Sequence, residues 1–136
     1  MSSEIEKNLE LSSDEQEILK KTLSLLELTY NEIDTNKRKD AENQLEELSK
    51  NTNSHIKILF SSLLMENLNL NMKKSVSIYL KNFIYKKIND KNLLKEILKI
   101  VIYFILYKKN DKIVSKQLNL LLLDLLNKED DEKLLF

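Results

Sequence analysis

Hydrophobic residues recur at spacings of three and four along most of the chain, which is the period of amphipathic helices. In the first such segment Ile18, Leu19, Leu23, Leu26 and Tyr30 fall on one helical face. The same pattern predicts six helices, at about residues 13–33, 36–49, 53–66, 71–88, 90–108 and 111–128. Most of the 136-residue chain is therefore expected to be helical.

The joints between these segments are short and rich in Asn and Asp, reading "DTN", "NTN", "NLN", "ND" and "KND". Both residue types cap helix N-termini and tolerate left-handed backbone, so they can replace glycine in the turns. Ser12 and Glu15 have the spacing of a capping box at the start of the first segment. Connections of this length predict that successive helices are antiparallel neighbours.

A pair of segments recurs about every 35–40 residues, since alternate segments begin near residues 13, 53 and 90 and near residues 36, 71 and 111. This period is close to the roughly 40–47 residues of HEAT and armadillo repeats. The chain has no glycine and no proline, which removes the favoured turns of β-hairpins. The predicted fold is an all-α superhelix, a HEAT-like solenoid of about six antiparallel helices in three pairs. A six-helix globular bundle is the alternative.

The pattern also predicts the domain organisation. Residues 1–12 are expected to be a flexible N-terminal segment, and residues 13–128 a single helical-repeat domain. Residues 129–136 are expected to be an acidic tail or the start of a next repeat. The segment at 90–108 contains "ILKIVIYFILY", which is apolar on nearly every side, so this helix is expected to be among the most buried.

Signatures of catalysis and of metal binding are missing from the sequence. A chain without glycine cannot form a P-loop or a dinucleotide-binding turn, and a chain without cysteine has no thiolate ligands. The single histidine, His55, lies near a helix start and is expected to be exposed to solvent. The longest apolar run, Ile100–Tyr107, is far shorter than a membrane span. We therefore expect no enzyme activity, cofactor, metal site or membrane insertion.

The charges are unevenly distributed, although the net charge is zero. Residues 1–50 hold 13 acidic and 7 basic residues, whereas residues 51–128 hold 5 acidic and 14 basic residues. A basic half is compatible with nucleic-acid binding. However, Arg38 is the single arginine among 22 basic residues, and bidentate recognition of phosphate or guanine favours arginine. Solvated helix faces are the favoured explanation, and nucleic-acid binding is unlikely.

Two stretches resemble the N-terminal domain of the importin-beta (karyopherin-beta) nuclear transport receptors. In "KRKDAENQLEEL", at residues 37–48, the family pattern of the first repeat's second helix is matched by Arg38, Ala41, Glu42 and Leu45. In "NLNMKKSVSIYLKNFIYKKI", at residues 69–88, the pattern of the second repeat is matched by Leu80, Lys81, Asn82 and Ile84. The "IYLKN" form is most similar to the importin seven/eight branch.

The resemblance implies a HEAT solenoid whose second helices line a concave surface that binds the GTP form of the small GTPase Ran. It implies a role in nucleocytoplasmic protein transport, with shuttling between nucleus and cytoplasm. Cargo proteins and nucleoporins would bind through C-terminal repeats that this chain lacks. The alternative is a helical-repeat scaffold or adaptor that binds another protein.

By the same resemblance, the residues expected to contact Ran are Arg38, Lys74, Lys81 and Tyr85. On the fourth segment Lys74, Ser77, Lys81 and Tyr85 recur at three or four residues and are expected to form one polar stripe. The other matched positions are expected to be structural, and Asn82 in particular to bond to backbone in the adjacent turn. Lys57, on a first helix of a pair, is expected to face the convex side.

Overall fold

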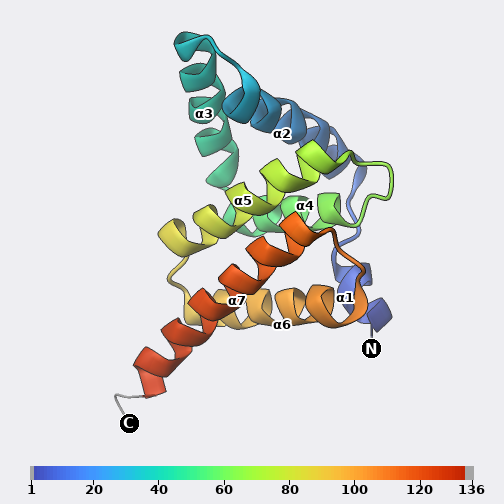
Figure 1. The fold of residues 1–136 in the computed structure, drawn as a ribbon, viewed down its shortest axis with the longest axis vertical. Coiled ribbons are helices and arrows are strands. Elements are labelled where there is room, and N and C mark those ends of the chain that lie inside the picture. The colour runs from blue at the N-terminus through green and yellow to red at the C-terminus, as the bar shows by residue number, and fades with distance from the viewer. Residues whose placement is uncertain (1, 134–136) are drawn as a thin grey trace. The chain divides into compact units, whose positions relative to one another are not determined.

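The computed structural model describes the backbone of residues 2–133 and the side chains of residues 4–128 (Figure 1). Within these residues the chain is all-α, without a strand. Its seven helices are α1 (Ser2–Asn8), α2 (Ser13–Asn31), α3 (Thr35–Ser49), α4 (Thr52–Leu63), α5 (Leu70–Lys87), α6 (Lys91–Tyr107) and α7 (Lys112–Lys133). The predicted all-α class is confirmed, and the six predicted segments correspond to α2–α7.

The two ends of the chain differ in part from the sequence analysis. Helix α1 lies within residues 1–12, where no helix was predicted. Helix α7 continues to Lys133, into the range predicted as a tail or a next repeat, and residues 134–136 of that range lie outside the described residues. The chain divides into two compact units, Glu6–Val76 and the part from Ser77 onward together with the first few residues.

The helix starts show why these sequences form helices without glycine. Ser12 Oγ accepts a hydrogen bond from Glu15 N at 3.2 Å, and Glu15 Oε1 accepts one from Ser12 N at 3.0 Å, so the predicted capping box is confirmed. Asp34, Asp90 and Asn69 likewise accept hydrogen bonds from backbone N–H groups two or three residues ahead. Among the described residues none has a positive φ, so Asn and Asp act here as caps and not as left-handed turn residues.

In the unit Glu6–Val76, α2 packs against both α3 and α4. Helix α4 is buried on most of its surface, through His55, Ile56, Ile58, Leu59, Phe60, Ser62 and Leu63. The expectation that His55 is exposed is wrong, because its side chain is only 2% exposed. Burial opposes the charged imidazolium and lowers the pKa of His55 to about 4.

A polar contact joins the start of α2 to α4 in the same unit. Lys57 Nζ lies 3.0 Å from Glu15 Oε1, and Ser54 Oγ donates to Glu15 Oε2 at 3.4 Å. The backbone hydrogen bond from Ser12, and then the Lys57 ammonium, lower the pKa of the Glu15 carboxyl. Lys57, which the sequence analysis expected on the convex side of a repeat, has its ammonium held by a carboxylate 42 residues away in the sequence.

In the unit from Ser77 onward, α6 packs against α7. The core-facing residues of the two helices are Ile97, Val101, Tyr103, Phe104, Val114, Leu118, Leu121 and Leu125. Ile102, Leu106 and Tyr107 of α6 are exposed. The expectation that this helix is among the most buried is therefore wrong, because it carries more apolar faces than α7 covers.

Candidate protein-binding surface

Three of the four residues expected to contact a partner lie on α5. Lys74, Lys81 and Tyr85 are separated by seven and four residues, which places them on one side of the helix. Lys74 and Tyr85 are exposed, and Lys81 is half-buried. Ser77, expected in the same polar stripe, is only 1% exposed, so the stripe is interrupted. The difference arises from the length of the side chains. A long lysine side chain brings its charge to solvent from a position where the short serine side chain is enclosed.

In the two motifs that carry the resemblance, the apolar positions are buried and the polar positions are exposed or half-buried. Their apolar positions are in the core, namely Ala41, Leu45, Leu80 and Ile84. Of the polar positions, Arg38 and Glu42 on α3 are exposed, and Asn82 on α5 is half-buried. Arg38 Nη2 lies 3.5 Å from Thr35 Oγ1. Arg38 and Lys74 belong to the unit Glu6–Val76, whereas Lys81 and Tyr85 belong to the unit from Ser77 onward. The four residues expected to contact Ran are therefore divided between the two compact units.

A lysine from α7 holds α7 to the end of α5. Lys128 Nζ donates to the backbone carbonyl oxygens of Tyr85, at 3.3 Å, and of Ile88, at 3.1 Å. The same ammonium lies 5.6 Å from the centroid of the Tyr85 ring. The last carbonyls of a helix have no partner within it, so Lys128 satisfies the carbonyl of Tyr85 in the last turn of α5 and that of Ile88 directly after the helix. Tyr85, a candidate contact residue, is thereby held beside Lys128 of α7.

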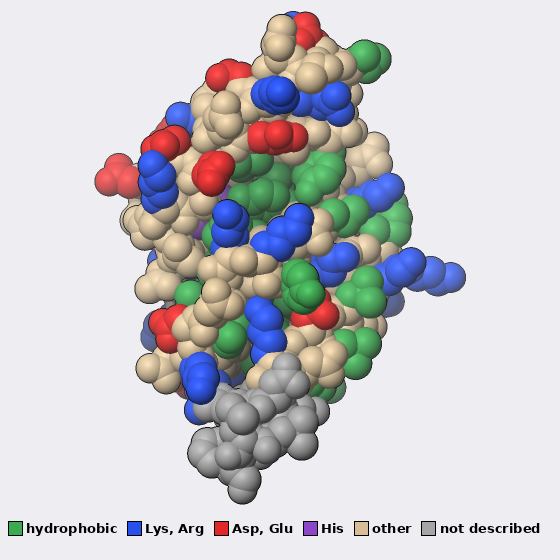
Figure 2. Space-filling view, turned by 90° about the vertical axis from the view of Figure 1, so that its left-hand side faces the viewer, with side chains coloured by type: hydrophobic (Ala, Val, Ile, Leu, Met, Phe, Trp, Pro, Cys, Tyr) green, Lys and Arg blue, Asp and Glu red, His purple; other side chains and the backbone are tan. Residues whose placement is uncertain are grey.

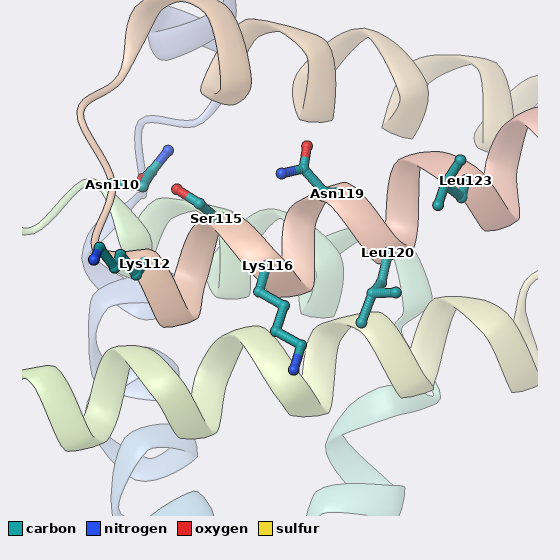
Figure 3. Close-up of a pocket in the computed structure, with 7 residues that line it drawn as sticks. All are labelled: Asn110, Lys112, Ser115, Lys116, Asn119, Leu120 and Leu123. Atoms are coloured by element: carbon teal, nitrogen blue, oxygen red, sulfur yellow. The ribbon is translucent and has the colours of Figure 1, made fainter.

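The exposed side of α7 bears a shallow, open depression. A shallow cavity of about 460 Å³ is lined by Asn110, Lys112, Ser115, Lys116, Asn119, Leu120 and Leu123. In Figure 3, Lys116 and Leu120 extend from one side of α7, and Ser115 and Asn119 extend from the opposite side, toward α6. All seven residues come from one helix and the turn before it. The turn is held by Asn110, whose Nδ2 donates to the backbone oxygens of Phe104 and Lys108.

The sequence analysis did not identify this face of α7. Its signal was present as the row Lys112, Lys116, Leu120 and Leu123, whose spacings of four, four and three mark a second helical face. This row was not recognised because α7 also has a longer, entirely aliphatic row that faces the core, namely Val114, Leu118, Leu121 and Leu125. Two leucines that follow two lysines on an exposed face provide apolar area together with positive charge, which is a combination suited to a protein partner.

Positive charge predominates over residues 77–128 of this unit. Residues 77–128 contain eleven lysines and four acidic residues, Asp90, Glu96, Asp111 and Asp124. On the face drawn in Figure 2, lysine side chains are separated by hydrophobic and polar ones.

Within the described residues, no group of His, Cys, Asp or Glu side chains could hold a metal ion. Nor does this part of the chain contain a helix with the length and apolar character needed to cross a membrane.

Comparison with protein-family models, curated proteins and solved structures finds no match to this chain. Two sequence motifs and the surfaces of α5 and α7 are therefore the features that bear on function.

Proposed function

We propose that this chain is a protein-binding helical-repeat module, with the HEAT-like arrangement of an importin-beta N-terminal segment, and that it binds the GTP form of the small GTPase Ran. The observation that carries the proposal is the pair of motifs at residues 37–48 and 69–88, above all the second, which contains Leu80, Lys81, Asn82 and Ile84 on α5. Leu80 and Ile84 of this motif are buried, whereas Lys81 and Tyr85 reach the surface. A helix with that division is anchored by its apolar positions and presents its cation and its aromatic ring to a partner.

The pairing of helices supports the repeat arrangement. Helices α2 and α3 pack together, as do α6 and α7, and each pair is formed by neighbours in the sequence. Helix α7 also contacts the end of α5, through Lys128. In a solenoid the second helices of successive pairs line one face, which is where such proteins bind partners. Lys81 and Tyr85 of α5 are the corresponding candidates in this chain.

The proposed role is in nucleocytoplasmic protein transport, by a protein that shuttles between nucleus and cytoplasm. The proposed partner is Ran bound to GTP, and cargo proteins and nucleoporins would bind further repeats. No catalytic residue, cofactor or metal enters this proposal.

A scaffold or adaptor that binds a different protein is the second candidate. The observation that favours it is the cavity on α7, whose exposed leucines would serve any partner with a complementary apolar group. Arg38 and Lys74, two of the residues expected to contact Ran, lie in the unit Glu6–Val76, whereas the cavity lies in the unit from Ser77 onward. These two residues are therefore not needed for the second candidate function.

The α5 surface is tested by reversing one charge. We expect Lys81→Glu to weaken the affinity for GTP-loaded Ran at least tenfold, because it places a carboxylate at the proposed interface. The matched control is Lys95→Glu on α6 in the same unit, an exposed lysine whose substitution changes the net charge equally. Long-range steering depends mainly on net charge, so it affects both variants alike.

The measurement is isothermal titration calorimetry on the two variants and the unmutated chain, with helicity checked by circular dichroism. A tenfold loss for Lys81→Glu with a change below about twofold for Lys95→Glu supports the α5 surface. Equal losses would reduce the interaction to nonspecific electrostatics, and the proposed contact at Lys81 would then be abandoned.

A further inference from the structure

The cavity on α7 has an apolar half and a basic half. Leu120 and Leu123 line one half, and Leu123 is 57% exposed. Leu126, also exposed, continues the row by one further turn. Lys112 and Lys116 line the other half. None of the core interactions described above uses these five side chains, so they are available to a partner.

The charge along the chain from residue 108 to residue 124, around the basic half of the cavity, is positive. Lys109 is exposed in the turn before α7, and Lys108 lies over the ring of Tyr103. The acidic residues near the cavity are Asp111, in the turn, and Asp124, half-buried one position beyond Leu123. Lysines therefore outnumber carboxylates around this end of α7, and an acidic group is the complement that it favours.

The spacing of the two halves sets the dimensions of the occupant. Lys116 and Leu123 are seven residues apart on one helix, which is about 10 Å along its axis. A partner must therefore present its carboxylates and its apolar side chains on one face at that separation. A helix of two to three turns does so, and a helix laid along a groove is a common mode of peptide recognition. Ser115 and Asn119 add neutral polar groups along one edge.

We propose that this cavity docks an acidic amphipathic helix of a partner protein, with its carboxylates at Lys112 and Lys116 and its aliphatic side chains at Leu120 and Leu123. A nucleic acid fits less well, because no arginine or aromatic side chain lines the cavity. This inference rests on the second candidate function, the scaffold or adaptor, because both use the cavity on α7. It does not depend on Ran, since it uses none of the α5 contact residues.

The probe is a fluorescein-labelled designed helical peptide with two glutamates four residues apart, followed three residues further on by the first of two leucines that are also four residues apart. This spacing places all four side chains on one face. We expect saturable binding by fluorescence anisotropy. Leu123→Ser should weaken it at least fivefold, and Lys116→Gln should weaken it and reduce its dependence on salt, because one ionic contact is lost. The matched control is Leu106→Ser on α6, since Leu106 is 67% exposed but lies outside the cavity. It should leave the affinity unchanged.

A second peptide of the same composition, with its leucines moved to the opposite face, should bind at least fivefold more weakly. Thermal unfolding of each variant establishes that α7 remains folded, and both substituted leucines are exposed, so neither change opens the core. The proposal is overturned if the first peptide does not bind, if Leu123→Ser and Leu106→Ser have equal effects, or if both peptides bind equally.

Discussion

Replacing Phe60 with alanine should lower the free energy of unfolding by about 3–5 kcal/mol, the range for removing a buried phenylalanine. Phe60 lies on α4 and its side chain is fully enclosed. Removing the ring loses its transfer from water and leaves a cavity that close-packed neighbours fill only in part. Urea denaturation followed by circular dichroism at 222 nm measures the change.

The control for this prediction is Ile33→Ala, in the turn between α2 and α3 of the same unit. Ile33 is 92% exposed, so its truncation should change the free energy of unfolding by no more than about 0.5 kcal/mol. A similar loss in the two variants would contradict the placement of α4 at the centre of the unit Glu6–Val76.

Acidification from pH 7 to pH 5 should lower the free energy of unfolding by about 2 kcal/mol through His55 alone. The pKa of His55 is lowered to about 4 in the folded chain, whereas an exposed histidine has the ordinary value of 6.5. Between these values the unfolded chain binds a proton that the folded chain does not. Stability from this group is therefore complete above about pH 6.5 and decreases as the pH falls toward 4.

The His55→Asn variant isolates this effect, because asparagine is polar but does not titrate. Its free energy of unfolding should be nearly constant between pH 7 and pH 5, even if the substitution lowers stability at every pH. Glu15 adds a separate loss at lower pH, because its lowered pKa gives stability that disappears as the folded carboxylate is protonated below its ordinary value of 4.5. Parallel pH profiles for the unmutated chain and His55→Asn would contradict the burial of a neutral imidazole.

The helices and their caps were predictable because they depend on neighbouring residues. The periodicity located α2–α7, and the spacing of Ser12 and Glu15 identified the capping box. The pairing of Glu15 with Lys57 was not predictable in this way, because it joins two helices across 42 residues of sequence. The burial of His55 and Ser77 likewise depends on which helices pack around them, and polarity alone indicated the wrong side.

The candidate surface was predictable in part. Lys81 and Tyr85 reach the surface on one side of α5, as their spacing indicated. Arg38 was assigned to the same surface from a motif, but the motif carries no information on which compact unit the residue joins. The exposed row on α7 was detectable from its spacing. Periodicity could not show which row of α7 faces the core, because the buried row and the exposed row both contain leucines.

Nucleotide discrimination is the measurement that tests the central claim most directly. The unmutated chain should bind immobilised Ran loaded with a non-hydrolysable GTP analogue at least tenfold more tightly than Ran loaded with GDP, in surface plasmon resonance at one salt concentration. A transport receptor must distinguish the two forms, whereas a general scaffold has no reason to do so. Equal affinity for the two forms, or no binding to either, would contradict the proposed role in nuclear transport.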